Sequence, residues 1–240
     1  MKTSKVNIDD QKGFYDTLWA HKKLNSLDLR RYVKILTYFI DIKRKLKQPK
    51  ILDLGCGTGK FIAMLGEFGQ AEGLELSTKA VETAQSLYPQ VKYFQGNALT
   101  YKLNDKSYDV IISQEVIEHI NEQDEYLKVC YNALKPGGYL ILTTPNKNVL
   151  DHMKDGKNWS NQPIENTLSK VQLKRLIKKK FEILDYDSII MNFGDQGVYK
   201  LINSRYAIGI ANKLGLKTWR EKRLGKLGYG LHQCILAVKK

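Results

Sequence analysis

Cysteine is scarce in this chain of 240 residues, which has three in all. Cys56, Cys130 and Cys234 stand far apart, and no two of them have the short spacing typical of metal ligands. An odd number of widely separated thiols argues against a disulfide framework and suits a reducing compartment. We therefore expect a cytoplasmic protein in which Cys130 and Cys234 are small apolar side chains of a core.

Long hydrophobic runs are missing too. No uninterrupted apolar stretch is long enough to cross a bilayer, and the first ten residues contain no apolar segment of the kind found in signal peptides. Internal repeats, low-complexity tracts and Gly/Ser linkers are absent as well. With 42% hydrophobic residues, a chain of this length is expected to bury one domain, with at most a small appended lobe.

Acidic residues are outnumbered by basic ones. The 39 Lys and Arg against 25 Asp and Glu give a formal net charge of +14, and residues 43–47, 174–180 and 217–226 carry much of the excess. Such a surface favours an anionic partner. This partner could be a phosphorylated or carboxylated substrate, a nucleic acid or an acidic membrane. A surface that is merely solvated explains the charge equally well.

Short apolar runs alternate with amphipathic segments after Pro49. Apolar runs bounded by turn residues predict strands at 51–54, 71–76, 91–94, 108–113, 139–144, 181–185 and 233–238. The 3.6-residue period predicts helices at 8–47, 60–68, 78–87, 122–134 and from 170 onwards. This alternation indicates an α/β fold with a doubly wound, mainly parallel sheet covered on both faces.

Boundary signals divide the chain further. Asn121 is expected to cap one helix, and Pro136–Gly138 to stop it before the next strand. Ser169 and Gln172 have the spacing of a capping box. We expect residues 1–48 to be an N-terminal helical lid and residues 49–240 to be the main domain, with insertions at about 146–168 and 192–229 that stay outside the sheet.

A strand, a glycine-rich turn and a helix start follow one another in Ile51–Phe61. Glycines at the end of a strand let a ligand approach the backbone, and the helix that follows offers free N–H groups. Glu75 lies 20 residues after Gly55 at the end of the next strand, where a carboxylate can accept both hydrogen bonds of a ribose diol. NAD fits this pattern as well. Asp53, two residues before the first glycine, argues against NAD because it would repel a pyrophosphate.

These motifs resemble those of class I S-adenosylmethionine-dependent methyltransferases over roughly residues 45–145. The matching segments, in family order, are Asp53–Gly59, Glu75, Gly96–Ala98, Ser107–Ile111 and Leu134–Leu140. The resemblance implies a Rossmann-like fold whose seven-stranded sheet ends in an antiparallel strand, with S-adenosyl-L-methionine as the cofactor. The residues it implies at the cofactor are Asp53, Gly55, Cys56, Gly57, Gly59, Glu75, Leu76, Asn97, Ala98 and Gln114, with Tyr15 as part of the lid. Packing of Tyr15 on the sheet is the simpler alternative.

Ser113–Ile120 borders the methyl group in the resembling family. We expect the catalytic residues to be His119, Glu115 and Glu118, with His119 as the general base, since an imidazole has an unperturbed pKa near ~6.5. If this turn is helical, Glu115, Glu118 and His119 share one face, and such a set suits a divalent metal. The same run resembles the metal motif of small-RNA 3′-end methyltransferases and also occurs in ubiquinone-biosynthesis O-methyltransferases; His152 is the candidate for a further ligand. A role in orienting the loop by hydrogen bonds is the preferred alternative to a metal.

The acceptor is expected to be a small molecule or a sugar or glycan intermediate of a biosynthetic pathway, methylated on oxygen. Trp159 is the candidate to stack on its ring, and a second group of candidates lines the same cleft: Tyr199, Asn203, Arg205 and Tyr206. RNA ends are the second choice, and quinone precursors remain an alternative. A cofactor-binding module without turnover is the least favoured. The oligomeric state is left open.

Overall fold

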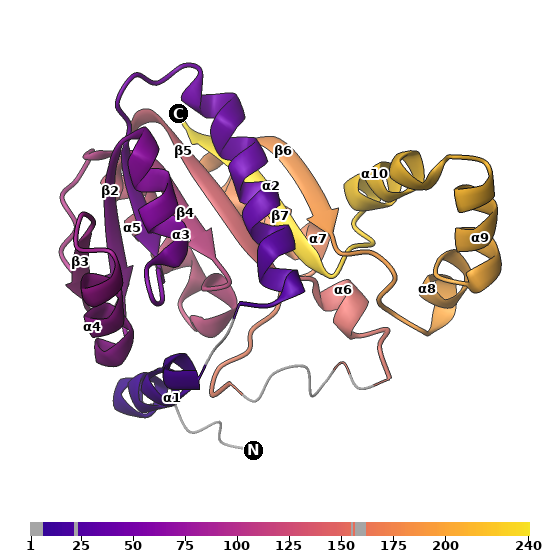
Figure 1. Ribbon diagram of the computed structural model, residues 1–240, viewed down its shortest axis with the longest axis horizontal. Coiled ribbons are helices and arrows are strands. Elements are labelled where there is room, and N and C mark those ends of the chain that lie inside the picture. Colours follow the sequence, from indigo (N-terminus) through magenta and orange to yellow (C-terminus); the bar gives the residue numbers. More distant parts are fainter. Residues whose placement is uncertain (1–6, 22–23, 155, 157–161) are drawn as a thin grey trace.

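A seven-stranded sheet forms the centre of the protein in a computed structural model that describes residues 7–21, 24–154, 156 and 162–240 (Figure 1). The strand order is β3-β2-β1-β4-β5-β7-β6. The strand bounds are β1 (Lys50–Leu54), β2 (Gln70–Glu75), β3 (Lys92–Gln95), β4 (Tyr108–Gln114), β5 (Leu134–Pro145), β6 (Phe181–Ile189) and β7 (His232–Lys239). Each predicted strand is present within a few residues of its expected bounds.

Strand direction follows the expected pattern. β1 runs parallel to β2 and β4, β2 parallel to β3, and β4 parallel to β5. β7 lies antiparallel between β5 and β6. The prediction of a doubly wound, mainly parallel sheet with an antiparallel last strand is confirmed, and the carboxyl ends of β1, β2 and β4 therefore meet at one edge.

Helices cover both faces of the sheet because the central strands are apolar on both sides. Ile51 packs with α2 (Ser26–Lys43), α3 (Lys60–Leu65) and α4 (Thr78–Leu87), and its neighbour Leu52 packs with α5 (Gln123–Ala133) and α7 (Lys170–Lys178). Successive residues of a strand point to opposite faces, so one strand feeds both cores. A 3-10 turn, η1 (Gly66–Phe68), follows α3 and completes the helix predicted at 60–68.

Residues 8–47, which were predicted to be helical, do not form one continuous helix. The segment forms α1 (Ile8–His21) and α2, and α2 ends at Lys43. Asn25 starts α2 through a capping box: its side chain accepts from the backbone N–H of Asp28, and the Asp28 carboxylate accepts from the N–H of Asn25. The new helix start lets α1 leave the sheet and lie apart from α2, beyond the lower edge of the sheet in Figure 1.

Two of the predicted boundaries also need correction. Glu122, not Asn121, is the first flanking residue of α5, and it makes no side-chain cap; Asn121 instead accepts from the Asn166 amide. Pro136–Gly138 lies inside β5, where the pairing with β4 jumps from Leu134 to Tyr139. The capping box of Ser169 and Gln172 is confirmed at the start of α7.

The described residues that connect β5 to α7 and β6 to β7 lie outside the sheet. After β5 comes the short α6 (Lys147–Leu150), and after β6 come α8 (Gly197–Ile202), α9 (Arg205–Lys213) and α10 (Lys217–Leu227). These last helices form a lobe beside the edge strand β6 (Figure 1). Gly225 allows the contact, because a Cβ there would lie 2.4 Å from the Asp187 carboxylate.

Within the described ranges, no helix is both long enough and apolar enough to span a membrane.

The two-sided core gives a first testable prediction. Ile111 of β4 is 0% exposed, and we expect Ile111→Ala to lower the free energy of unfolding by about 2–5 kcal/mol, since the cavity it leaves in the middle of the sheet cannot collapse. Ile40 of α2 is 51% exposed, and Ile40→Ala is the matched control, with an expected change within ~0.5 kcal/mol. Urea unfolding of both variants is the measurement; equal losses would contradict the placement of β4 at the centre.

Candidate functional site

A cavity of about 330 Å³ opens at the sheet edge where β1, β2 and β4 end, with α1 on its other side. Its volume falls in the range of small-molecule sites. The predicted residues that line it are Tyr15, Asp53, Gly55, Cys56, Glu75, Leu76, Asn97, Ala98, Gln114, Glu115 and His119. Of the other predicted residues, Gly57, Gly59 and Glu118 are not among the described lining residues.

The glycine turn bends because three of its residues have left-handed backbone angles. The φ values are 82° for Gly55, 54° for Gly57 and 75° for Gly59. Residues other than glycine rarely adopt this backbone conformation. A Cβ on Gly55 would lie 2.4 Å from Val116 Cγ2, at the cavity wall. Gly57 lies under the indole ring of Trp19 from α1. Gly55 thus faces the cavity, and the other two glycines shape the turn.

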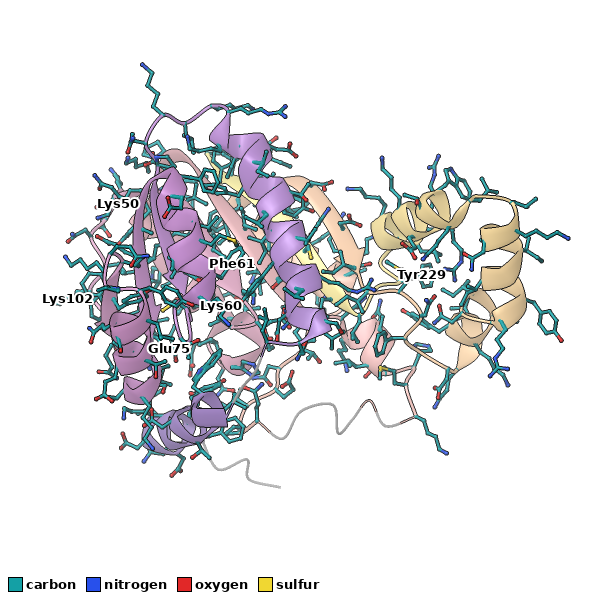
Figure 2. All side chains as sticks on the ribbon, in the orientation of Figure 1. Lys50, Lys60, Phe61, Glu75, Lys102 and Tyr229 are labelled. Atoms are coloured by element: carbon teal, nitrogen blue, oxygen red, sulfur yellow. The ribbon has the colours of Figure 1, made fainter. Side chains whose placement is uncertain are left out.

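Glu75 ends β2 directly beside this turn (Figure 2). Its Oε2 accepts from the backbone N–H of Gly57 at 2.9 Å, and its Oε1 accepts from that of Ser77 at 2.9 Å. A carboxylate has about four acceptor positions. The two oxygens are therefore fixed in place by the backbone and retain capacity for the two hydroxyls of a ribose.

Two buried oxygens at the cavity have no hydrogen-bond partner: Asp53 Oδ1 and Gln114 Oε1. Burial, together with the nearby Glu75 charge, raises the pKa of Asp53 to about 7. A buried carboxyl without a partner is costly unless a donor or cation arrives. S-adenosylmethionine carries an ammonium and a sulfonium, so the residues present fit this cofactor, and they fit a dinucleotide pyrophosphate poorly.

The α1 helix is held over the cavity by polar contacts to three different parts of the chain. The Gln11 amide donates to the His119 carbonyl at 2.9 Å, and the Tyr15 hydroxyl donates to Gln162 Oε1 at 2.8 Å. Asp16 accepts from the Ser77 hydroxyl and from the Lys79 N–H at the start of α4. The predicted role of Tyr15 at the roof is consistent with this position.

A charged cluster lies where α2 and β7 meet the cavity. Arg31 lines the cavity, forms an ion pair with Asp28 and lies 3.8 Å from Glu115 Oε2. His232 Nδ1 lies 2.7 Å from the same oxygen, and the Thr143 hydroxyl donates to Glu115 Oε1. Although burial acts to raise it, the charges of His232 and Arg31 lower the pKa of Glu115 to about 2. Glu115 is therefore a fixed anion.

Glu118 and His119 occupy the short 3-10 turn η2 (Ile117–His119). Burial, with the nearby Glu115 charge, raises the pKa of Glu118 well above its usual value. The Glu118 carboxyl accepts from the Thr144 hydroxyl at 2.8 Å. His119 Nδ1 lies 2.8 Å from the Ile164 carbonyl oxygen. A carbonyl only accepts, so Nδ1 carries the proton and Nε2 is left as an acceptor.

The prediction that Glu115, Glu118 and His119 share one helical face is wrong. Glu115 has a left-handed φ of 55° and precedes the turn, and the two carboxylates bond to different threonines of β5. Among the residues that the structure describes, no three His, Cys, Asp or Glu side chains are grouped to hold a metal ion. His152 does not complete such a set, because it packs on the Tyr199 ring and its Nδ1 donates to the Asn148 carbonyl, and it is not among the described residues that line the cavity.

The residues predicted to bind the acceptor are not found at the cavity, as far as the structure describes them. Trp159 lies outside the described residues. Tyr199 is buried against His152 and Tyr229, Asn203 donates to backbone carbonyls of residues 193 and 194, and Tyr206 is exposed on the lobe. With Arg205, they are not among the described residues that line the cavity, so this prediction is wrong. The lobe folds beside β6, away from the ends of β1 and β2.

Sequence reasoning missed His232 and Glu165. Glu165 Oε2 lies 3.8 Å from His119 Nδ1, and both oxygens of its buried carboxylate lack a hydrogen-bond partner. His232 was missed because the last strand was expected to begin at residue 233, whereas β7 begins at His232, opposite Pro145. Glu165 directly follows Ile164, whose carbonyl contacts His119, and no motif in the sequence points to this glutamate.

Comparison with known proteins agrees with this geometry. Residues 52–142 match the family described as "Methyltransferase domain". A probable S-adenosylmethionine-dependent methyltransferase of Mycolicibacterium smegmatis is 32% identical over 98 residues, which are 40% of this chain and 38% of that protein. The mitochondrial ubiquinone biosynthesis O-methyltransferase of Rattus norvegicus is 32% identical over 123 residues, 47% of this chain and 35% of that protein. The chain thus spans well under two thirds of these curated relatives.

The fold is similar to that of solved structures over nearly its whole length. The PH0226 protein of Pyrococcus horikoshii superposes with a TM-score of 0.64 and 18% identity, and the match covers 95% of this chain and 99% of that one. At this identity the likeness speaks for the fold. The family match covers the glycine turn, Glu75 and the strands β2 to β4, and the strand order is the one that the motifs imply. On this agreement, residues 52–142 form a methyltransferase domain of the class I S-adenosylmethionine-dependent type.

Proposed function

We propose that this chain transfers the methyl group of S-adenosylmethionine to a hydroxyl group of a small molecule, with a sugar or glycan intermediate as the leading class. The observation that carries the proposal is the state of His119, whose Nδ1–H is held by the Ile164 carbonyl while its Nε2 remains an acceptor at the cavity. Nε2 lies 3.6 Å from Glu118 Oε1, beyond hydrogen-bond distance. An imidazole oriented in this way at a small enclosed site suits a general base for a hydroxyl.

The cofactor site is supported by residues from three strand ends. Glu75 would hold the ribose diol, Asn97 and Ala98 would lie at the adenine, and Asp53 with Gln114 would face the positively charged methionine part. When bound, the cofactor supplies an electrophilic methyl group on a sulfonium. The chain itself has to position the acceptor oxygen in line with that methyl group and to exclude water under α1.

His119 would take the proton of the acceptor hydroxyl on Nε2. Glu165, 3.8 Å from Nδ1, is placed to stabilise the imidazolium that results. The Glu118 carboxyl, which accepts from the Thr144 hydroxyl of β5, keeps η2 in place. In this assignment Glu115 transfers no proton. It contacts Arg31 and His232 and forms part of the cavity wall.

A quinone precursor is the second candidate acceptor, because ubiquinone biosynthesis O-methyltransferases are among the relatives at about 30% identity. An RNA end is less favoured, since the described carboxylates and histidines are not grouped as metal ligands. Incubation with labelled S-adenosylmethionine and a panel of sugar nucleotides, catechol-type quinone precursors and short RNAs tests the proposal. Label in sugars supports it, label only in catechols or RNA replaces the acceptor class, and cofactor binding without transfer to any of them contradicts it.

Gly55 tests the cofactor site directly. We expect Gly55→Ala to weaken S-adenosylmethionine binding by about tenfold or more, because the added Cβ meets Val116 in the cavity wall and the φ of 82° resists any side chain. Gly137→Ala is the matched control: its φ is 75°, but nothing lies within 4 Å of the added atom. Calorimetric titration of both variants is the measurement, and equal affinities would count against this site.

Asp53 predicts a pH dependence of cofactor binding. Its pKa near 7 means that the carboxyl is mostly neutral at pH 6 and mostly ionised at pH 7.5. A cationic ligand favours the ionised form, so affinity should rise with pH over this interval, by up to roughly tenfold. Asp53→Asn should remove the rise. Because ionisation of the ligand itself is the same for both proteins, the difference between the two titration profiles isolates Asp53; parallel profiles would disprove the assignment.

His119 is tested by turnover. We expect His119→Asn to lower kcat by about 100-fold or more, the usual contribution of a general base, while affinity for S-adenosylmethionine changes little. His152→Asn is the control, since His152 is not among the described residues that line the cavity. Single-turnover assays with any acceptor found in the panel give the rates. An unchanged rate for His119→Asn would remove this residue from the mechanism.

A further inference from the structure

The lobe formed by α8, α9 and α10 leaves large apolar side chains in water. Tyr206 is 85% exposed, Ile210 62% and Trp219 58%. Further exposed apolar side chains of the lobe are Val198, Leu201, Leu214, Leu216 and Leu227. Single exposed apolar residues are ordinary on a protein surface, but a set gathered in one small lobe marks an interaction site.

The exposed side chains follow helical spacing. Tyr206, Ile210 and Leu214 are four residues apart along α9 and the turn that follows it, so they line one stripe of the helix, whereas Ala211 is buried. Trp219 and Leu227 are eight residues apart on α10 and share a face in the same way. Leu216 in the connecting turn is exposed between the two helices.

Basic residues flank these stripes. Residues 197–227 contain eight Lys and Arg against one acidic residue, Glu221. In the part of the chain that the structure describes, Lys226 pairs with Asp185 and the other seven form no ion pair: Lys200, Arg205, Lys213, Lys217, Arg220, Lys222 and Arg223. Of these seven, Arg223 lies over the Trp219 ring at 5.6 Å. The exposed face of the lobe is therefore both apolar and strongly positive.

The opposite side of the lobe is fixed to the domain. Arg220 donates to the Ile202 carbonyl and so ties α10 to α8. The Ser188 hydroxyl of β6 donates to the Gly225 carbonyl at 2.9 Å. Lys226 forms an ion pair with Asp185 of β6. These contacts hold α10 against the edge strand, so its apolar stripe cannot turn inward to be buried.

From this combination we propose that the α8–α10 lobe docks the protein onto an anionic membrane surface. Helices that lie in a bilayer interface combine a Lys- and Arg-rich polar side with Trp, Leu and Ile on the other, as this lobe does. A second copy of the chain is a poor occupant, because two faces of the same strong positive charge repel each other. RNA would be contacted through stacking aromatics, whereas most exposed side chains here are aliphatic.

Sedimentation of the full chain with vesicles tests the proposal without any measurement of activity. We expect binding to vesicles of 30 mol% phosphatidylglycerol in phosphatidylcholine, little binding to pure phosphatidylcholine, and loss of binding as salt rises. Removing two charges with Lys213→Gln and Lys222→Gln should lower the partition coefficient by about 30-fold, from the ~1 kcal/mol that each basic residue contributes near such a surface. Ile210→Ser with Trp219→Ser should lower it as well.

Matched controls separate the lobe from general charge and hydrophobicity. Lys102→Gln removes a charge at the far end of the molecule from the lobe (Figure 2), and Val33→Ser removes an exposed apolar side chain of α2; both should bind as the unchanged protein does. Brominated lipid quenches the fluorescence of a tryptophan that inserts into the bilayer. We expect less quenching in Trp219→Phe even if this variant still binds, so the proposal can be tested even if the double variants fold poorly.

Three results would overturn the proposal. These are equal binding to neutral and anionic vesicles, loss of vesicle binding with the Lys102 control as great as with the lobe variants, and vesicle binding that is absent. In the last case, a dimer in sedimentation velocity that the Ile210 and Trp219 substitutions dissociate would assign the face to a second copy. A mobility shift of single-stranded RNA that the Lys213 and Lys222 substitutions abolish would assign it to RNA.

Discussion

The bond between the Gly57 N–H and the Glu75 carboxylate connects the two halves of the cofactor site. It joins the turn after β1 to the end of β2, and these two strands are neighbours in a parallel sheet, so their carboxyl ends meet at one edge. The left-handed glycines allow the turn to bring this N–H back to Glu75, and Ser77 holds the second oxygen. The cavity, its roof under α1 and the nearby acid–histidine pairs all depend on this junction staying in place.

The sheet could be predicted from the sequence because its signals are local. Apolar runs such as Ile51–Leu54 are buried on both sides, and helices between them have a clear 3.6-residue period, so the alternation of elements fixes the architecture. The differences have two causes. The break between α1 and α2 rests on a local capping box, in which Asp28 takes the place of the usual Glu or Gln. Asn121 makes no cap because it accepts from Asn166, 45 residues away, which is a tertiary contact.

The cofactor side of the cavity was more predictable than the catalytic side. Asp53, Gly55 and Glu75 could be assigned to the site because strand ends and glycine turns are recognisable in the sequence itself. Glu115 gains its low pKa from Arg31 of α2 and His232 of β7, residues 84 positions before it and 117 after it. His119 is oriented by the Ile164 carbonyl of a loop that has no regular pattern. Spacing along the chain does not show such contacts, since they arise only when distant segments pack together.

The position of β7 also determines how early during synthesis the wall of the cavity can form. This strand is the last of the seven in sequence, yet it inserts between β5 and β6 and delivers His232 to the wall of the cavity. A ribosome-bound chain that has emerged only as far as β6 has an open sheet, and its Glu115 lacks the contact with His232. The wall of the cavity therefore becomes complete only once β7 has been made and inserted, and a nascent chain cannot be stabilised before that point by capturing its ligand.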